Sequence, residues 1–162
     1  MKIPLTAQGG KRQNRKLLEQ GLTLTEVLVV IAIVTLLAAV ALPAYRKART
    51  RGLTVATMTL IHSVEAALSM YATDFGDYPF YSGKETKVLV KLLQGPVESR
   101  LWKGPYMRFK VKDIDREKNI IDAWRMPLFY DYPQDKRENV PCIIISAGPD
   151  RKMETGDDIT NW

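Results

Sequence analysis

The sequence offers few side chains of the types that perform chemistry. Cys142 is the only cysteine and His62 the only histidine among the 162 residues. An intrachain disulfide and a cysteine-based zinc site are therefore excluded. Cys142 opens the apolar run 142–145, where a buried, unreactive thiol is expected, because a reactive one requires a basic or helix-terminal setting. His62 is predicted to lie on a helix surface. Sequence motifs of hydrolases, metalloproteases and phosphate-binding loops are absent, so no enzyme is predicted.

Carboxylates gather near the C-terminus, where Asp150, Glu154, Asp157 and Asp158 lie within nine residues. Calcium takes about six to eight hard oxygen ligands in flexible geometry, so three carboxylates with backbone carbonyls and water are chemically adequate. The spacing is not that of an EF-hand, because the sixth position lacks glycine. Acidic surface loops are common, and the spacing alone therefore favours a solvated loop over a calcium site.

Glu26 is the other side chain in an unusual setting, because it immediately precedes 19 consecutive residues without a formal charge, 27–45. A carboxylate costs about 2.5–3.5 kcal/mol at the centre of a membrane helix and less near the interface. Two interpretations follow. Glu26 either stabilises the helix dipole from the first turn, at headgroup level, or has a cationic partner inside the bilayer.

The uncharged run 27–45 has the length of a membrane span, since about 20 apolar residues cross the hydrocarbon core. This length favours a membrane helix over a buried soluble one. A conventional signal peptide fits poorly, because 41–47 is a weak cleavage site. Four basic residues flank each end, so the positive-inside rule leaves the orientation undecided. These are Lys11, Arg12, Arg15 and Lys16 before the run, and Arg46, Lys47, Arg49 and Arg51 after it.

The net charge of +6 is unevenly distributed, because residues 1–21 carry five basic residues against one acidic residue. Without this segment little basic surplus remains, so the charge is poor support for nucleic-acid binding. DNA binding stays a weak alternative. The pair Asp113 and Asp115 is interpreted as part of a solvated turn. Packing in the core, and not base stacking, is expected for the aromatic residues Trp102, Tyr106, Trp124 and Tyr130.

The periodicity of apolar residues predicts one long helix, about 23–72, followed by a small sheet. A buried face recurs at helical spacing and comprises Leu60, Ile61, Val64, Ala67, Leu68 and Tyr71. Pro43 removes one helical hydrogen bond and is expected to kink or loosen the helix. A turn at 74–79 ends it, and a short helix is predicted at 84–93. Strands are predicted at 106–111, 119–121, 128–132 and 142–146. The fold class is therefore α+β, with one modest core.

The segment 11–49 resembles the class III signal of type IV pilins and type II secretion pseudopilins. Its features are a basic leader ending in Gly21, a glutamate at Glu26 and an apolar run to Pro43. The resemblance implies a leader at 1–21, a transmembrane and polymerisation half of the helix at 22–45, and a pilin-like globular head at 46–162. It further implies that a prepilin peptidase cuts between Gly21 and Leu22 and methylates the new terminus. Leu22 departs from the more usual phenylalanine.

Cleavage after Gly21 would create a cationic partner for the carboxylate of Glu26. Cutting after Gly21 creates an α-ammonium at Leu22, which Glu26 of a neighbouring subunit can neutralise in a filament of packed helices. Such a pair stabilises one axial register. Glu26 and Pro43, both placed as in that family, are therefore interpreted as assembly residues and not as catalytic ones.

Four further segments are similar to the major pseudopilin of type II secretion: 71–79, 102–107, 122–130 and 145–162. In that family the terminal loop binds calcium, and the matching positions here are Asp150, Asp157 and Asp158. Some residues depart from the family pattern. Ala123 and Arg125 replace proline and glycine in one turn, and Arg151 replaces a glycine in the acidic loop.

The resemblance implies a type IV pilin-like fold and a structural subunit of the type II secretion pseudopilus, which drives export of folded proteins across the outer membrane. The implied location is the bacterial inner membrane, crossed once, with the head in the periplasm. The implied partners are copies of the chain, minor pseudopilins, the prepilin peptidase, the inner-membrane secretion platform and, before assembly, membrane lipid. No nucleic acid is expected.

The alternative is a type IV pilin for adhesion, twitching or DNA uptake. Such pilins commonly close their C-terminal region with a disulfide, which a single cysteine cannot form. A membrane-anchored enzyme is a third interpretation, and no catalytic motif supports it.

Overall fold

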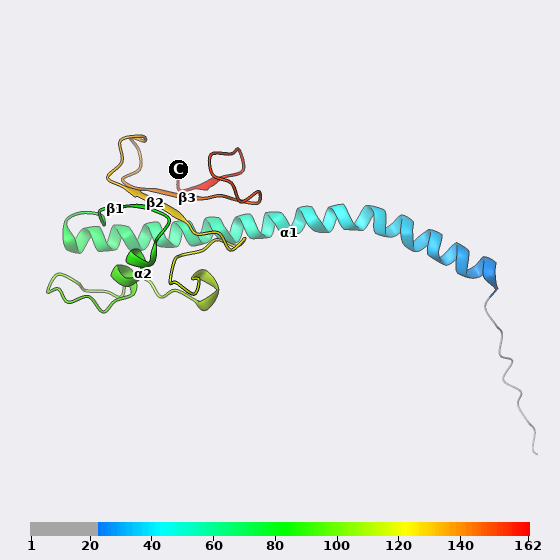
Figure 1. Cartoon of the computed structure of the whole chain (residues 1–162), viewed down its shortest axis with the longest axis horizontal. Helices are drawn as coiled ribbons and strands as arrows, with labels where there is room; N and C mark the ends of the chain where they lie inside the picture. Colours follow the sequence, from blue (N-terminus) through cyan, green and yellow to red (C-terminus); the bar gives the residue numbers. More distant parts are fainter. Residues whose placement is uncertain (1–22) are drawn as a thin grey trace, which may run out of the picture. The chain divides into compact units, whose positions relative to one another are not determined.

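A computed structural model of the chain describes residues 23–162. The chain divides into two compact units, Met1–Leu42 and Pro43–Trp162. Helix α1 belongs to both units, and all other elements belong to the second (Figure 1). The elements are α1 (Leu24–Phe75), β1 (Tyr81–Gly83), α2 (Lys87–Gln94), the 3₁₀ helix η1 (Val111–Asp113), β2 (Phe129–Tyr132), β3 (Ile143–Ser146) and β4 (Ile159–Thr160).

Helix α1 has 52 residues and confirms the long helix predicted at about 23–72. It continues through Pro43, and the kink expected there stays a prediction. The helix ends at Phe75, and the next residue, Gly76, has a φ of 84°, a left-handed conformation that glycine adopts without penalty. The amide of Gly76 donates to the carbonyl of Ala72 at 2.8 Å and closes the last turn.

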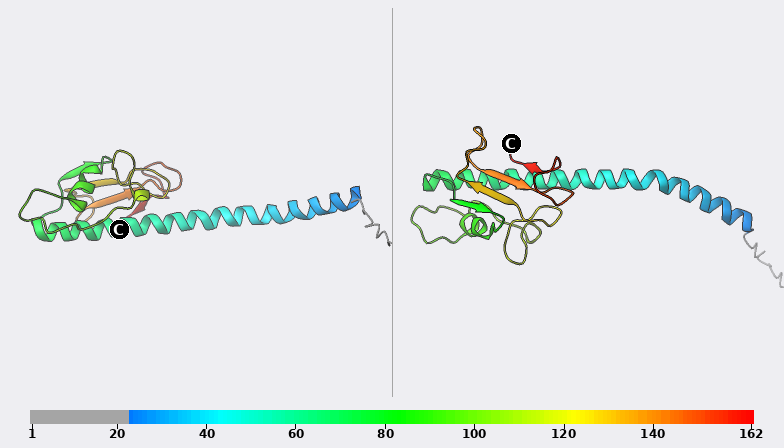
Figure 2. Two further views of the ribbon diagram at one scale, coloured as in Figure 1. Left: turned by 90° about the horizontal axis from the view of Figure 1, so that it is seen from below. Right: turned by 45° about the horizontal axis from the view of Figure 1, so that its top comes forward.

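The four strands form one antiparallel sheet in the order β1-β2-β3-β4. Tyr81 pairs with Tyr132, Phe129 with Ile145, and Ile145 with Thr160. In both views of Figure 2 the strands lie alongside the C-terminal half of α1. The sheet and this half of the helix therefore form the two layers of the head, as expected for an α+β domain.

The core lies between α1 and the sheet. The predicted apolar face is buried at Ile61, Val64 and Leu68, whereas Leu60 is only partly buried. These side chains pack with residues of α2 and of the sheet, among them Leu89, Leu93, Leu128, Tyr130 and Ile144. Each such side chain contributes about 1.5–3 kcal/mol on burial. Packing on the head therefore stabilises the second half of α1. The first half of the helix has no such packing.

The strand predicted at 106–111 is wrong. The amides of Tyr106 and Met107 donate to the carbonyl of Leu93, at 2.8 and 3.2 Å, so the end of α2 satisfies them in place of a neighbouring strand. Next to the end of α2, the ring of Trp102 covers Gly95, where a Cβ atom would collide with it. The indole of Trp102 donates to the carbonyl of Leu92 at 3.0 Å.

The remaining strand predictions are confirmed in part. Those at 128–132 and 142–146 correspond to β2 and β3. The one at 119–121 is reduced to two isolated bridges, Ile114 with Ile120 and Ile121 with Pro127. The helix predicted at 84–93 is α2, which begins three residues later. The short strands β1 and β4 were not predicted.

A buried carboxylate organises the turn between Asp122 and Met126. Asp122 is 3% exposed, and its Oδ1 accepts the amides of Trp124 at 2.9 Å and Met126 at 2.8 Å. Its Oδ2 accepts the hydroxyl of Ser146 at 2.7 Å, which links the turn to the end of β3. Arg125, the residue that replaces a glycine, has a φ of 69°. The turn therefore places a non-glycine residue in the left-handed region, at a cost of about 1–2 kcal/mol.

Candidate assembly segment and C-terminal loop

Glu26 takes part in a reciprocal cap at the start of α1. Its Oε2 accepts the amide of Thr23 at 2.8 Å and the hydroxyl of Thr23 at 2.7 Å. The amide of Glu26 in turn donates to Thr23 Oγ1 at 3.3 Å. This is a capping box, in which two free amides of the first turn find side-chain acceptors. Glu26 therefore caps the helix end of its own chain.

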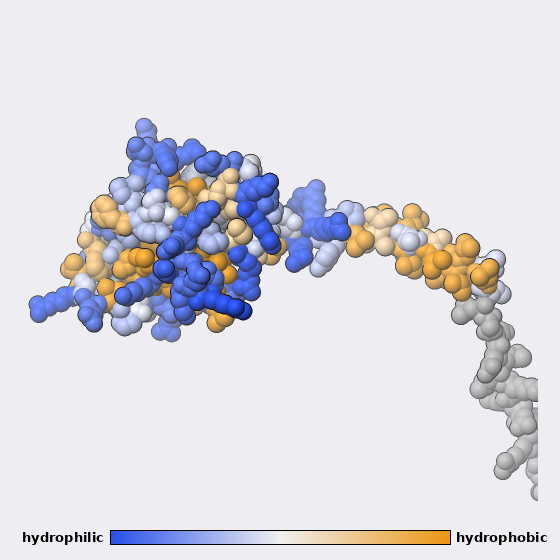
Figure 3. Space-filling view, in the orientation of Figure 1, coloured by the Kyte–Doolittle hydropathy of each residue, from blue (hydrophilic) through white to orange (hydrophobic). Residues whose placement is uncertain are grey.

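The part of α1 that lies in the first unit presents an apolar surface that no residue of 23–162 covers. None of the residues 24–42 is buried, and they include bulky side chains such as Leu36 and Val40. Figure 3 shows this segment as a mostly hydrophobic surface. Helix α1 is long and apolar enough to cross a membrane. A surface of this kind requires lipid or other helices as its environment.

The predicted processing and assembly residues are only partly described. Gly21 and Leu22 lie outside the described residues, so the cleavage site stays a prediction. Glu26 lies in the first turn of α1, and Pro43 lies inside the same helix. From Glu26 to Pro43 there are 17 residues, or about 26 Å along a helix at 1.5 Å per residue. The acid and the proline therefore stand close to opposite ends of the apolar segment.

The C-terminal loop, 147–158, is held by backbone and side-chain hydrogen bonds. Oδ2 of Asp157 accepts the amide of Asp150 at 3.0 Å, and its Oδ1 accepts the hydroxyl of Thr155 at 2.7 Å. These two bonds, from Thr155 foremost, lower the pKa of Asp157. Gly148 has a φ of 63°, and a Cβ atom there would collide with the carbonyl oxygen of Asp157. The two arms of the loop therefore approach each other as closely as glycine allows.

The predicted calcium ligands are not gathered into one cluster. Among residues 23–162, no three histidine, cysteine or acidic side chains are arranged to hold a metal ion together. Asp150 and Asp157 are brought together by their hydrogen bond, while Asp158 Oδ2 accepts the amide of Glu154 at 2.8 Å. The other oxygen, Asp158 Oδ1, is buried and has no hydrogen-bond partner in the described part of the chain. A buried carboxylate oxygen without a donor suits a hard cation, so the donor chemistry fits calcium. Arg151, where the family has glycine, has a φ of 62°.

Cys142 is placed as expected for a structural residue. It is fully buried in the core next to β3, and burial raises the pKa of its thiol to about 12. A thiol of this kind is protonated and unreactive at neutral pH. His62 lies on an exposed part of α1, where its Nδ1 is 3.4 Å from a carboxylate oxygen of Glu65.

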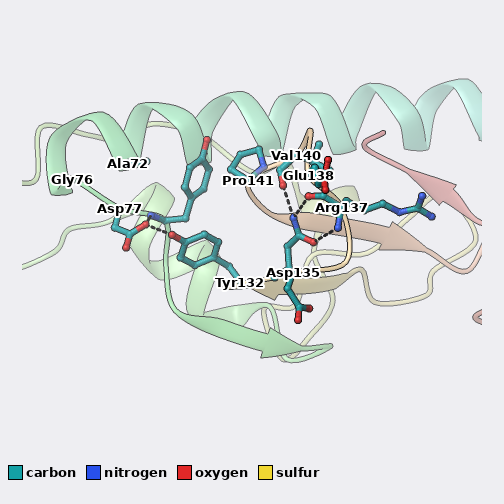
Figure 4. A pocket seen from close by; sticks show the side chains of 11 residues that line it. Ala72, Gly76, Asp77, Tyr132, Asp135, Arg137, Glu138, Val140 and Pro141 are labelled. Atoms are coloured by element: carbon teal, nitrogen blue, oxygen red, sulfur yellow. Dashed lines mark hydrogen bonds between the residues drawn. The ribbon is translucent and has the colours of Figure 1, made fainter.

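An open pocket of about 500 Å³ lies between the C-terminal end of α1 and the loop 133–141 (Figure 4). The hydroxyl of Tyr132 donates to the carboxylate of Asp77 across it. On the loop side, Gln134 Oε1 accepts the amide of Arg137 at 2.8 Å, and its Nε2 donates to the carbonyls of Arg137 and Val140. Gln134 therefore closes the loop on itself, and Tyr132 links the end of β2 to the turn that follows α1.

A long N-terminal helix with an exposed apolar half, packed through its other half on a small antiparallel sheet, defines a type IV pilin-like protein. Residues 45–162 match the sequence profile of the family "Type II secretion system (T2SS), protein G". The chain belongs to this family. The matched region is the entire head, and the N-terminal segment precedes it.

Several curated proteins are similar to the chain. The "Type II secretion system core protein G" of Escherichia coli is 30% identical over 145 residues, which cover 89% of this chain and 91% of that protein. The protein of the same name from Pseudomonas aeruginosa is 30% identical over 147 residues, or 89% and 95% of the two chains. A "Fimbrial protein" of Neisseria meningitidis serogroup B is 33% identical over 106 residues, or 65% and 55%. No solved structure matched the chain.

These similarities confirm three predictions made from the sequence. The first is that the chain is a type II secretion pseudopilin. The fold is α+β and pilin-like, because both the secretion proteins and the fimbrial proteins match the chain. The chain is a structural subunit and not an enzyme, as its family membership indicates.

Two residues with a structural role were missed from the sequence. Thr23 was not recognised as the partner of Glu26, although a threonine three residues before a glutamate, followed by an apolar run, is the signature of a capping box. Asp122 was identified only as part of a family segment. No pattern marks a single acid as buried, because its hydrogen bonds come from Ser146, 24 residues away, and from its own turn.

Proposed function

We propose that the chain polymerises into the pseudopilus of a type II secretion system and thereby helps to export folded proteins across the outer membrane. The observation that carries the proposal is the exposed apolar half of α1, with the carboxylate of Glu26 at its start. Helices of this kind exclude water only by packing on one another or by lying in lipid. The head remains available outside the bundle of helices.

Assembly would depend on a change of partner at Glu26. In the uncleaved chain its carboxylate is bonded to Thr23. Cleavage after Gly21 would place an α-ammonium at Leu22, close to the same acid in the chain. In a filament, that ammonium would pair with Glu26 of the adjacent copy, so that neither charge stays unpaired among apolar side chains. The pair would fix the axial register of neighbouring subunits.

Before assembly, the chain is proposed to lie in the bacterial inner membrane as a single-pass protein with its head in the periplasm. Lipid would cover the apolar half of α1 before assembly, and other copies would cover it in the filament. Minor pseudopilins, the prepilin peptidase and the inner-membrane secretion platform are the further partners of this scheme.

Mass spectrometry of the N-terminus of the protein isolated from its native bacterium tests the proposal. A chain that begins with methylated Leu22 is expected. Recovery of chains that retain Met1 in cells with an active secretion system would contradict processing. A chain cut elsewhere in the apolar run would contradict the filament.

The second candidate function is a type IV pilin for adhesion, twitching or DNA uptake, and the fimbrial relatives favour it. They cover only 65% of this chain or less, whereas the secretion proteins cover 89%. Electron microscopy at native expression distinguishes the two. Long surface fibres are expected of a pilin, and their absence together with loss of exported protein in a deletion strain is expected of a pseudopilin.

Calcium is proposed as a structural cofactor of the C-terminal loop. Asp150, Asp157 and Asp158 would supply carboxylate oxygens, with backbone carbonyls and water completing the shell. The buried, unpartnered Oδ1 of Asp158 supports the proposal. The loop has little apolar surface to order it, so an ion bound only to the folded loop would stabilise the head by linkage.

Calcium is expected to raise the melting temperature of the full chain in detergent by several degrees relative to a chelator. In Asp157→Ala the difference between calcium and chelator should vanish. This variant also loses two hydrogen bonds, which lowers its melting temperature under both conditions. Calorimetry of both proteins with and without calcium measures the difference. Asp135→Asn, which alters an exposed acid of the loop 133–141, should keep it. Identical melting curves of the parent in calcium and in chelator would exclude the site.

A further inference from the structure

Four basic residues follow the apolar segment of α1 directly: Arg46, Lys47, Arg49 and Arg51, hereafter the basic collar. All four side chains are exposed. None of them forms a salt bridge with any residue of 23–162, although other lysines of the head do. In Figure 3 hydrophilic side chains replace the hydrophobic surface at this point of the helix. The collar therefore carries four positive charges without a counter-charge in the described chain.

No acid on the same helix compensates the collar. The next carboxylate along α1 is Glu65, 14 residues beyond Arg51, or about 21 Å at 1.5 Å per residue. Electrostatic interactions between exposed charges are screened over about 8 Å at physiological ionic strength. No carboxylate of α1 therefore lies close enough to neutralise the collar, which leaves its charges available to an anion outside the chain.

The shape of the collar favours an anion that surrounds the helix. The four residues extend over about 7.5 Å of helix length, and at 100° per residue they occupy about 200° of its circumference. A second protein contacts one face of a helix, so it would meet only some of these cations. The headgroups of a bilayer encircle a membrane helix and can meet all of them.

The position of the collar along the chain also favours headgroups. The uncharged run 27–45 is about 28 Å long as a helix, close to the hydrocarbon thickness of about 30 Å. The collar begins at the next residue. One headgroup layer is about 5–7.5 Å thick, which is also the length of the collar. Tyr45, exposed at the boundary, is of a type enriched at membrane interfaces.

We propose that the basic collar binds the phosphates of anionic phospholipids and so anchors the unassembled subunit at a fixed depth. The inference rests on the proposed function in one respect, namely that α1 lies in a bilayer before assembly. Guanidinium groups bind phosphate oxygens through two parallel hydrogen bonds, and three of the four residues are arginines. Leaving the membrane for the filament then requires that these phosphates be released.

Native mass spectrometry of the full chain from nanodiscs tests the proposal. The nanodiscs contain equal amounts of phosphatidylglycerol and phosphatidylcholine, and the lipids that stay bound after ejection are counted. The parent is expected to retain mainly phosphatidylglycerol. Replacing all four collar residues by glutamine should lower the ratio of retained phosphatidylglycerol to phosphatidylcholine by more than about fivefold, the effect of roughly one basic residue near a charged surface. The basic residues of segment 1–21 are present in the parent and in the collar variant alike, so they cannot cause a difference between the two.

A matched control removes the same number of arginines and lysines from the head. Its four glutamine substitutions are at Arg100, Arg108, Lys112 and Arg116, which are exposed and form no salt bridge within 23–162. The control should retain the lipid ratio of the parent. An unchanged ratio in the collar variant, or an equal loss in the control, would overturn the proposal.

The test separates this inference from the proposed function. A chain that shows the collar-dependent lipid preference but is never processed at Gly21 would contradict the proposed filament subunit and support the proposed lipid binding by the collar. A processed chain that assembles and exports, but shows no lipid preference, would refute the collar alone.

Discussion

Replacing Glu26 by glutamine is expected to abolish filament assembly and export. Glutamine can occupy the same position of a capping box, because its amide oxygen accepts the bonds that Thr23 now donates to the carboxylate. The helix start is therefore preserved and only the negative charge is lost. If the proposed pairing is correct, the α-ammonium of the neighbouring Leu22 then stays unpaired in apolar surroundings.

The expected effect is large, since removing one partner of a buried ion pair costs about 3–5 kcal/mol. This corresponds to a decrease of more than about 100-fold in the association constant of each subunit. Sheared filaments quantified by immunoblot, together with the exported protein in the medium, measure the loss. A Glu26→Gln chain that polymerises and exports like the parent would show that the carboxylate acts only on its own helix.

Thr23→Ala is the matched control. It removes the hydroxyl that bonds Glu26 but leaves the carboxylate and its charge. Loss of an N-cap costs about 0.5–2 kcal/mol of helix stability, and assembly should stay close to the parental level. If Thr23→Ala and Glu26→Gln are equally defective, the cap and not the charge is what assembly requires.

Asp122→Ala is expected to destabilise the head by about 3–4 kcal/mol. The substitution leaves the amides of Trp124 and Met126 and the hydroxyl of Ser146 without their acceptor. Each buried donor without a partner costs about 1–3 kcal/mol. The melting temperature of the full chain in detergent, followed by near-ultraviolet circular dichroism, should fall by about 10 °C or more. A decrease of less than a few degrees would mean that water replaces the carboxylate at no cost.

Arg125→Gly tests the same turn in the opposite direction. At a φ of 69° glycine lacks the steric penalty of an L side chain. Part of this gain is offset, because glycine also has more freedom in the unfolded chain. A rise of a few degrees in melting temperature is expected. The pair of variants separates the acceptor at Asp122 from the backbone strain beside it.

The parts of the fold that the sequence predicted are those with a long or strongly apolar pattern. Helix α1 follows from the spacing of Ile61, Val64 and Leu68, and β3 from the apolar run 142–145. The two missed strands are three and two residues long. Neither length contains a detectable alternation, and their extended shape comes from pairing with β2 and β3. The segment 106–111, wrongly predicted as a strand, has strand-like residues, but the amides of Tyr106 and Met107 donate to the carbonyl of Leu93 in α2.

Polar residues in the core were beyond prediction for a related reason. Asn161 is buried near the C-terminus, where its Oδ1 accepts the amide of Ile144 at 2.9 Å. Its Nδ2 donates to the carbonyl of Cys142 at 3.0 Å and to the carboxylate of Glu65 at 2.8 Å. Glu65 is 96 residues away in sequence. Contacts of this range depend on the completed packing and leave no local signal. For Glu26, by contrast, the spacing to Thr23 carried the information.

The buried thiol of Cys142 has a practical consequence for mapping a filament. It is the only cysteine of the chain, and burial together with a raised pKa protects it from maleimides and mild oxidants. A cysteine introduced at any exposed position would then be the single labelling site per subunit. Pairwise disulfide trapping or distance measurements between spin labels could thus follow neighbouring copies without first removing a native residue.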